Sequence, residues 1–209
     1  MNTLIKERTR VLFQGDSITD SSRNRDDPQD LGKGFPMMAA SWFSALHPEM
    51  KVEFLNRGIS GDRTKDLVQR WDADCLALKP GWVSILIGIN NMWRRYDSND
   101  PTPLDRFEAE YHTILDRTRG ELKAKLILCE PFLLPISEEH IRWREDLEPK
   151  INVVHRLADD YHAILIPLDR LFREACERRE PAFWAPDGVH PSLAGHAYIA
   201  QTWLRYVNA

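Results

Sequence analysis

Five short runs of apolar residues recur along the chain, with mostly polar segments between them. They are RVLFQ at 10–14, KVEFLN at 51–56, WVSILIG at 82–88, AKLILCEP at 124–131 and AILIPL at 163–168. In the middle runs the apolar residues follow one another almost without interruption, instead of alternating with polar ones. Strands have this pattern when both faces of their sheet are covered, as in parallel sheets. The pattern therefore predicts five buried parallel strands.

Helical periodicity occupies segments between and after these runs. In TKDLVQRWDADCLALKP, the side chains of Leu67, Trp71, Cys75 and Leu78 share one face of a helix, and charged residues fill the opposite face. Similar patterns predict helices within 103–122, 136–162 and 191–207.

Two positions bear on where these helices begin and end. Ser192 follows Pro191 and is suited to cap the last helix. Pro149 is expected to bend, start or split the helical region around it, because proline cannot donate a helical hydrogen bond. The polar stretch YDSNDPTP at 96–103 is expected to form a long loop, at the mouth of a site.

Strands that alternate with helices predict βαβ units with right-handed crossovers. We therefore expect an α/β fold in which five parallel strands lie between two layers of helices. No linker rich in Pro, Gly or Ser interrupts the chain, and 209 residues suit one domain of ordinary size. The prediction is a single domain over 1–209.

The composition narrows the class of protein. Hydrophobic residues make up 43% and charged residues 29%, which is typical of soluble globular chains. A net charge of -4 gives no general attraction to nucleic acid or anionic membranes. No segment approaches the ~20 apolar residues of a membrane helix, and the N-terminus lacks the apolar stretch of a signal peptide. A cytoplasmic location is therefore expected.

The three cysteines, Cys75, Cys129 and Cys176, are widely spaced. They form no CxxC pair or Cys/His cluster, so neither a disulfide framework nor a cysteine metal site is expected. Free thiols fit a reducing compartment. Asp187, His190 and His196 could be imagined as metal ligands, but their spacing gives no strong support, and the prediction is that no metal or cofactor is needed.

Four polar segments are candidates for chemistry. They are GDSITD at 15–20, NRGISGDRT at 56–64, GINNMW at 88–93 and APDGVHPS at 185–192. The first three each follow a predicted strand, and ligands of parallel sheets bind at the carboxyl ends of the strands. We therefore expect the four segments to meet at one edge of the sheet.

Together these segments supply what acyl transfer to a serine requires. Ser17 needs a base to take its proton, and His190 is a suitable base. Asp187 lies three positions before His190, so that one turn could bring its carboxylate to the imidazole. The backbone N–H of Ser17, a backbone N–H at Gly61 and the side-chain amide of Asn90 could stabilise an oxyanion.

Each segment alone has a simpler interpretation. Gly-Asp-Ser after a strand is commonly a turn and helix cap, and the other three could be turns or polar loops. All four in this order favour catalysis. The Gly-x-Ser-x-Gly elbow, the phosphate loop, the GxGxxG fingerprint and HExxH are absent.

With these blocks the chain resembles the SGNH hydrolase superfamily, the GDSL-type lipases and esterases. The matching blocks are GDSIT, GISGD, GINN and DGVHP. The resemblance implies a flavodoxin-like three-layer α/β/α sandwich, a triad of Ser17, His190 and Asp187, and an oxyanion hole from Ser17, Gly61 and Asn90. The third block of the family commonly has Asp where Asn91 stands here, which implies altered hydrogen bonding around the site.

The longer stretches NRGISGDRTKDLVQRWDADCLALKPGWVSILIGINNMWRRYD and VHPSLAGHAYIAQTWL also look like bacterial intracellular GDSL esterases that deacetylate xylo-oligosaccharides. This resemblance implies a serine carboxylic-ester hydrolase that acts on an acetylated saccharide, and homo-oligomers are common among such esterases. The alternatives are a lysophospholipase or thioesterase, and a catalytically silent carbohydrate-binding protein.

Aromatic residues near the blocks bear on the substrate. Trp93 and Trp184 could stack on sugar rings, although each could equally be a core residue. Together with Asp16 they form the predicted substrate-binding set. His196 is expected to be structural. Arg94 and Arg95 could contact substrate hydroxyls, but the favoured interpretation is that they are solvated loop charges. The other tryptophans are expected to pack in the interior: Trp42, Trp71, Trp82, Trp143 and Trp203.

Overall fold

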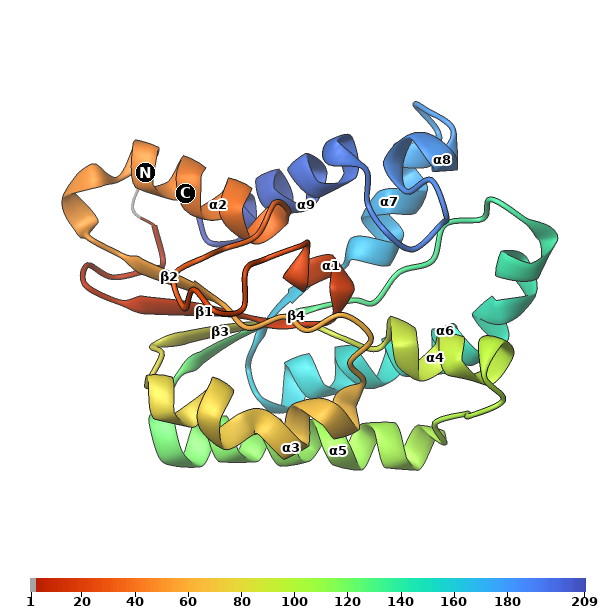
Figure 1. The fold of residues 1–209 in the computed structure, drawn as a ribbon, viewed down its shortest axis with the longest axis horizontal. Helices are drawn as coiled ribbons and strands as arrows, with labels where there is room; N and C mark the ends of the chain where they lie inside the picture. The colour runs from red at the N-terminus through yellow and green to blue at the C-terminus, as the bar shows by residue number, and fades with distance from the viewer. Residues whose placement is uncertain (1–2) are drawn as a thin grey trace.

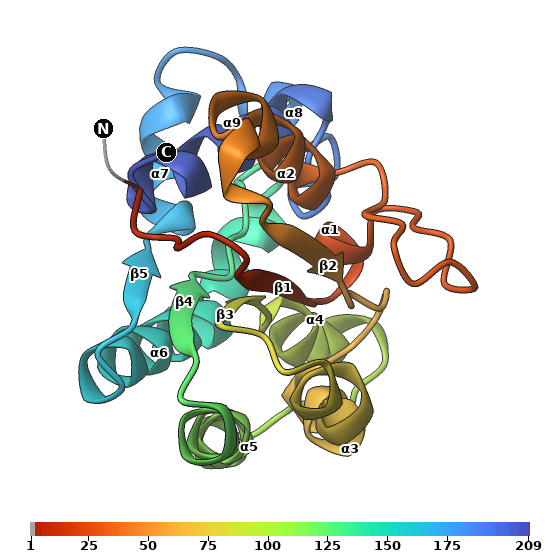
Figure 2. The same cartoon turned by 90° about the vertical axis from the view of Figure 1, so that its left-hand side faces the viewer.

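The computed structural model describes residues 3–209, which build one five-stranded, fully parallel sheet (Figures 1 and 2). The strand order is β2-β1-β3-β4-β5. The strands are β1 (Arg10–Gly15), β2 (Glu53–Asn56), β3 (Trp82–Leu86), β4 (Lys125–Cys129) and β5 (Ile164–Ile166). All five lie within the predicted apolar runs or extend them by one residue, so the predicted parallel α/β sheet is confirmed.

Helices cover both faces of this sheet (Figure 1). One layer contains α2 (Phe35–Leu46), α7 (Leu168–Cys176), α8 (Pro181–Trp184) and α9 (Leu193–Tyr206). The other contains α3 (Thr64–Asp74), α5 (Leu104–Arg117) and α6 (Glu138–Asp160). Two helices, α1 (Ser17–Asp20) and α4 (Ile89–Asp97), directly follow strands β1 and β3 at the carboxyl edge of the sheet. The expected three-layer arrangement is therefore present.

Several helices differ from the sequence prediction in their extent. The helix expected over 64–80 ends as α3 at Asp74 and continues as a 3-10 turn over Leu76–Leu78. Within the segment 136–162, the helix α6 runs without a break from Glu138 to Asp160 with Pro149 inside it, so proline does not split it. The pattern of apolar residues did not predict the helices α2, α4, α7 or α8. A 3-10 turn at Pro48–Met50 and a π-turn at Thr118–Leu122 complete the elements.

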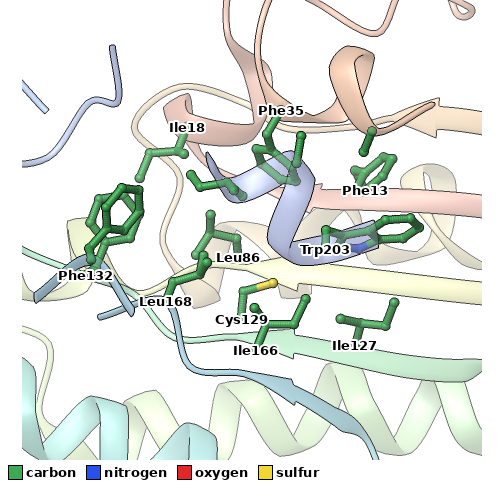
Figure 3. Packing of buried hydrophobic residues seen from close by; sticks show 14 of the residues in the cluster. Phe13, Ile18, Phe35, Leu86, Ile127, Cys129, Phe132, Ile166, Leu168 and Trp203 are labelled. Carbon is green, nitrogen blue, oxygen red and sulfur yellow. The ribbon is translucent and has the colours of Figure 1, made fainter. Parts of the chain in front are cut away.

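The alternation of side chains along the strands divides the core in two. In β1, Val11 and Phe13 face the α2–α9 layer, whereas Leu12 belongs to the cluster on the opposite face. Trp203 of α9 packs against Phe13, and their ring centroids are 5.2 Å apart. Figure 3 shows both side chains within the core. Its indole N–H donates to Ser84 Oγ in β3 at 3.1 Å, so that the buried polar group has a partner. These contacts anchor α9 on the sheet.

The tryptophans that were expected to pack do not all do so. Trp71, Trp82 and Trp203 are buried, as predicted, and Trp143 is partly buried. Trp42 is 63% exposed, which corrects the prediction for this residue. It lies on the outward side of α2, whereas Phe35, Ala39 and Phe43 form the buried side.

Within residues 3–209, none of the helices has the length and apolar character needed to span a bilayer.

Candidate active site

Ser17 begins α1, immediately after β1. The preceding Gly15 allows the chain to turn there, because a Cβ at this position would lie 2.3 Å from the carbonyl oxygen of Leu86. Asp16 caps the short helix, since its Oδ1 accepts a hydrogen bond from the backbone N–H of Ile18 at 3.1 Å. The turn therefore holds the Ser17 hydroxyl at the carboxyl edge of the sheet.

The structure brings Ser17, His190 and Asp187 together. Ser17 Oγ lies 2.9 Å from Nε2 of His190, and Nδ1 of His190 lies 2.6 Å from Oδ2 of Asp187. A carboxylate at Nδ1 keeps the proton on that nitrogen, so Nε2 is left to accept the hydrogen bond from the serine hydroxyl. This arrangement can move a proton from the hydroxyl to the imidazole.

The Asp187 carboxylate is held by its own loop. Its Oδ1 accepts hydrogen bonds from the backbone N–H groups of Val189 at 3.0 Å and His190 at 2.7 Å. Burial alone would raise the pKa of Asp187, but the hydrogen bonds from His190 and Val189 outweigh it and keep the pKa below its ordinary value. Asp187 is therefore a carboxylate at neutral pH and can stabilise an imidazolium.

The loop that carries Asp187 and His190 turns at Gly188. This glycine has a φ of +79°, and its carbonyl accepts from the backbone N–H of Leu134 at 2.8 Å. A Cβ on Gly188 would lie 2.5 Å from Nδ1 of His140, a buried side chain that itself donates to the Leu134 carbonyl at 3.1 Å. His140 therefore supports the loop. The sequence offered no signal for this role, because the contact joins distant segments.

The oxyanion candidates lie on the neighbouring segments. Gly61 is exposed with a φ of +88°, and no atom lies within 4 Å of where a Cβ would stand. The preceding Ser60 is fixed by Asp20, whose Oδ2 accepts from its backbone N–H at 3.0 Å and its hydroxyl at 3.1 Å. Asp20 is a buried carboxylate whose role was not predicted from the sequence, although it ends the GDSITD block.

Asn90 lies in the first turn of α4 and is 3% exposed. Its Nδ2 donates to the carbonyl of Asp62 at 3.1 Å, and its Oδ1 accepts from the Arg94 guanidinium at 3.2 Å. Since no other acceptor among residues 3–209 bonds to Nδ2, one amide N–H stays available to a ligand. The bond to Asp62 also ties Asn90 to the loop that carries Gly61.

Asn91 points away into a buried polar network. Its Oδ1 accepts from the backbone N–H of Thr64 at 3.2 Å, and its Nδ2 donates to Thr64 Oγ1 at 2.9 Å. The Thr64 hydroxyl can then donate its own proton to Oε2 of Glu110 at 2.6 Å. An amide suits this place better than a carboxylate, because two carboxylates would compete for one hydroxyl proton.

The predicted substrate-binding residues have different positions. Trp93 is half-buried, and its ring centroid lies 5.9 Å from that of His190, so it remains a candidate wall of the site. Asp16 is 1% exposed and caps α1, so its observed role is structural, and its assignment to substrate binding stays a prediction. Burial raises the pKa of Asp16 to about 7, and its Oδ2 has no hydrogen-bond partner.

Trp184 is 7% exposed, and its indole packs against Tyr198 and Phe172. Its Nε1 donates to the carbonyl of Arg179 at 3.3 Å. With Trp42 it lines an apolar groove of about 850 Å³ beside α2 and α9. The indole is enclosed by these rings and exposes little surface, so packing is its observed role, and its assignment to substrate binding stays a prediction.

His196 has the structural place expected of it. Its Nδ1 accepts from the backbone N–H of Phe35 at 3.2 Å, at the start of α2. Burial, together with the nearby His190, lowers the pKa of His196 to about 4, so this acceptor stays neutral. The part of the chain that the structure describes contains no group of three His, Cys, Asp or Glu side chains placed to hold a metal ion.

Comparisons by sequence find proteins that are similar over almost the whole chain. The model of the GDSL-like Lipase/Acylhydrolase family matches residues 13–198. An acetylxylan esterase of Geobacillus stearothermophilus is 35% identical over 207 residues, which cover 95% of this chain and 94% of the esterase.

Solved structures are similar over almost the same length. The crystal structure of the Geobacillus stearothermophilus acetylxylan esterase has a TM-score of 0.91 and 34% identity, over 98% of this chain and 96% of the other. Forms of that esterase called catalytic mutants carry alanine in place of a serine, a histidine or an aspartate. A proposed GDSL-like lipase of Parabacteroides merdae has a TM-score of 0.92 and 29% identity, over 98% and 97%.

Proposed function

The chain belongs to the GDSL-like lipase/acylhydrolase family and is a serine carboxylic-ester hydrolase, and we propose that Ser17, His190 and Asp187 are its catalytic triad. The observation that carries the proposal is the pair of hydrogen bonds from Ser17 Oγ to His190 Nε2 and from His190 Nδ1 to Asp187 Oδ2. The serine, histidine and aspartate replaced in catalytic mutants of the esterase relative support it.

The reaction follows from this geometry. His190 takes the Ser17 proton as Oγ attacks the ester carbonyl, and Asp187 stabilises the imidazolium that forms. The backbone N–H groups of Ser17 and Gly61 and the free amide N–H of Asn90 bind the oxyanion. His190 then protonates the departing alcohol, which leaves an acyl group on Ser17. His190 then takes a proton from water as the water attacks the acyl carbonyl. The bond between the acyl group and Ser17 Oγ breaks, His190 returns the proton to Oγ, and the acid is released.

The substrate proposed is an acetyl ester on a carbohydrate. The relative with 35% identity is an acetylxylan esterase. In this chain the half-buried indole of Trp93 flanks His190, where it could contact the leaving sugar through its flat apolar face. Asn91 does not favour the alternative of a catalytically silent protein. Its side chain is hydrogen-bonded within the Thr64–Glu110 network, and the proposed catalytic residues are all present in the chain.

Three further expectations remain predictions: a cytoplasmic location, self-association, and the absence of a cofactor requirement. Sedimentation of the purified protein tests self-association directly. Activity after dialysis against EDTA tests the expectation that no metal is needed.

The experiment for the substrate compares acetyl release from acetylated xylo-oligosaccharides with hydrolysis of p-nitrophenyl acetate and octanoate. Wild type should release acetate and prefer the acetyl to the octanoyl ester, and Ser17→Ala should lose ~10³-fold or more of kcat on each. Faster octanoate hydrolysis would instead favour a lipase or thioesterase. Turnover that does not depend on Ser17 would contradict the proposed triad.

A further inference from the structure

Arg94 is the one charged side chain shown in direct contact with an oxyanion candidate, among the residues that the structure describes. It follows Asn90 by four positions on α4, and its guanidinium donates to Asn90 Oδ1 at 3.2 Å. The same guanidinium pairs with Asp97 and lies 5.9 Å from the ring centroid of Trp93. Trp93 in turn neighbours His190. Arg94 therefore links the amide of Asn90 with the aromatic wall beside the base.

We propose that Arg94 is a positioning residue that holds the Asn90 amide in the one orientation that directs its free N–H toward the oxyanion. The inference rests on the proposed function. A side-chain amide can turn by half a revolution and exchange its oxygen and nitrogen. The Arg94 guanidinium can only donate, and the Asp62 carbonyl can only accept. In the turned amide, the NH₂ group would face the guanidinium and the amide oxygen would face the carbonyl oxygen, so both hydrogen bonds would be lost.

The charge of Arg94 adds a second effect. A guanidinium at the amide oxygen draws electron density from the nitrogen, which makes its N–H groups stronger donors. The positive charge also lies one amide away from the negative charge that develops on the substrate oxygen. Both effects act on the transition state more than on the bound ester, so they should alter kcat rather than KM.

The next residue provides a matched control. Arg95 is exposed and pairs with Glu145 of α6 at 3.3 Å, and it lies over Tyr96. It has the same charge and the same helix as Arg94, yet its recorded partners do not include Asn90. From the sequence, both arginines are expected to be solvated loop charges, with contact to substrate hydroxyls as the alternative. The structure separates them, because only Arg94 is four residues from Asn90 on the helical surface.

The experiment measures kcat and KM for p-nitrophenyl acetate in Arg94→Met, Arg94→Lys and Arg95→Met. Methionine keeps an apolar stem beside Trp93 but removes every donor. Arg94→Met should lower kcat by ~10-fold, a part of the ~10²–10³-fold that a whole oxyanion donor provides, with KM within about twofold of wild type. Arg94→Lys should retain most of kcat, and Arg95→Met should match wild type. Melting temperatures monitor folding.

A double-mutant cycle with Asn90→Ala separates positioning from other roles. In the Asn90→Ala background, Arg94→Met should lower kcat by less than about twofold, because the group that Arg94 positions is gone. The same ~10-fold loss in both backgrounds, a rise of KM alone, or an unchanged kcat in Arg94→Met would each overturn the inference. Wild type and Ser17→Ala are assayed first. Equal rates for these two would overturn the proposed function, and the inference with it.

Discussion

The two sides of the site differ in how far they are buried. On the nucleophile side, Asp16, Asn90 and Asn91 are at most 3% exposed and follow directly from β1 and β3. On the base side, the side chains of Asp187 and His190 are 49% and 45% exposed and belong to a loop. One side is ordered by the core of the sheet and the other by a few hydrogen bonds around Gly188.

Each kind of support has its own consequence. Burial holds the nucleophile side rigidly, but it also encloses polar atoms such as the unpartnered Oδ2 of Asp16. The base side stays in contact with water, so its charges are well solvated and its order depends on a turn that only glycine adopts easily. Mutations on the two sides should therefore separate effects on stability from effects on chemistry.

The largest effect is expected from removing the exposed base. His190→Ala should lower kcat by ~10³-fold or more, because Ser17 loses the group that takes its proton. The melting temperature should change little, since the imidazole is half-exposed and packs only against Trp93 among the described aromatic rings. Steady-state kinetics and thermal melting check both parts. More than a tenth of wild-type activity in His190→Ala would break the comparison.

Asp16 should make the stability of the nucleophile side depend on pH. Its pKa in the folded protein, about 7, lies above the ordinary 3.8, so the folded state holds the proton more tightly than the unfolded state. The stability that this proton provides is complete below pH ~4 and is lost as the pH rises to ~7. The loss has an upper bound of about 4 kcal/mol, at ~1.4 kcal/mol per pKa unit.

Asp16→Asn removes this titration. As the pH rises from about 4.5 to 8, the melting temperature of Asp16→Asn should increase relative to that of wild type, because asparagine needs no proton to remain neutral. Asp26→Asn, at an exposed position in the following loop, is the control and should not show the trend. A difference between Asp16→Asn and wild type that stays constant over this pH range would refute the burial of a titrating carboxyl.

Gly188→Ala should disturb the base side through its backbone. Alanine at a φ of +79° is strained, and its Cβ would press on Nδ1 of His140 and the Leu134 carbonyl. We expect a loss of about 1–3 kcal/mol in the free energy of unfolding and a reduced kcat. Gly120→Ala is the matched control, because no atom lies within 4 Å of its Cβ position. Chemical denaturation measures both, and equal stabilities would contradict the account.

The last prediction concerns Asn91, where the family commonly has Asp, and it is confined to stability. Asn91→Asp should lower stability by about 1–3 kcal/mol, because the new carboxylate and that of Glu110 would then compete for the Thr64 hydroxyl proton. Adding Glu110→Gln should restore most of the loss, since glutamine can donate to Thr64. Additive losses in the double variant, measured by denaturation, would show that the two positions are not coupled through Thr64.

Sequence patterns could predict the parallel sheet because each strand forms a continuous apolar run, and α9 because Ser192 caps a clear amphipathic stripe. Ser17, Asp187 and His190 could be proposed as a triad because four short blocks occur together in one order, although each block alone is commonly a turn or a cap. Trp42 and Trp184 could not be placed, since an indole on a helix has the same pattern whether it is exposed or enclosed. Asp20 and His140 act on distant segments, and nothing near them in the sequence indicates those contacts.

The central claim is that His190 activates Ser17, and labelling by a serine-directed organophosphonate tests it most directly. The measurement follows the modified peptide by mass spectrometry over time in wild type and His190→Ala. The account predicts one phosphonyl group per chain on Ser17 of the wild type, and labelling slower by orders of magnitude in His190→Ala. A label on another residue, or equal labelling rates for the two proteins, would contradict it.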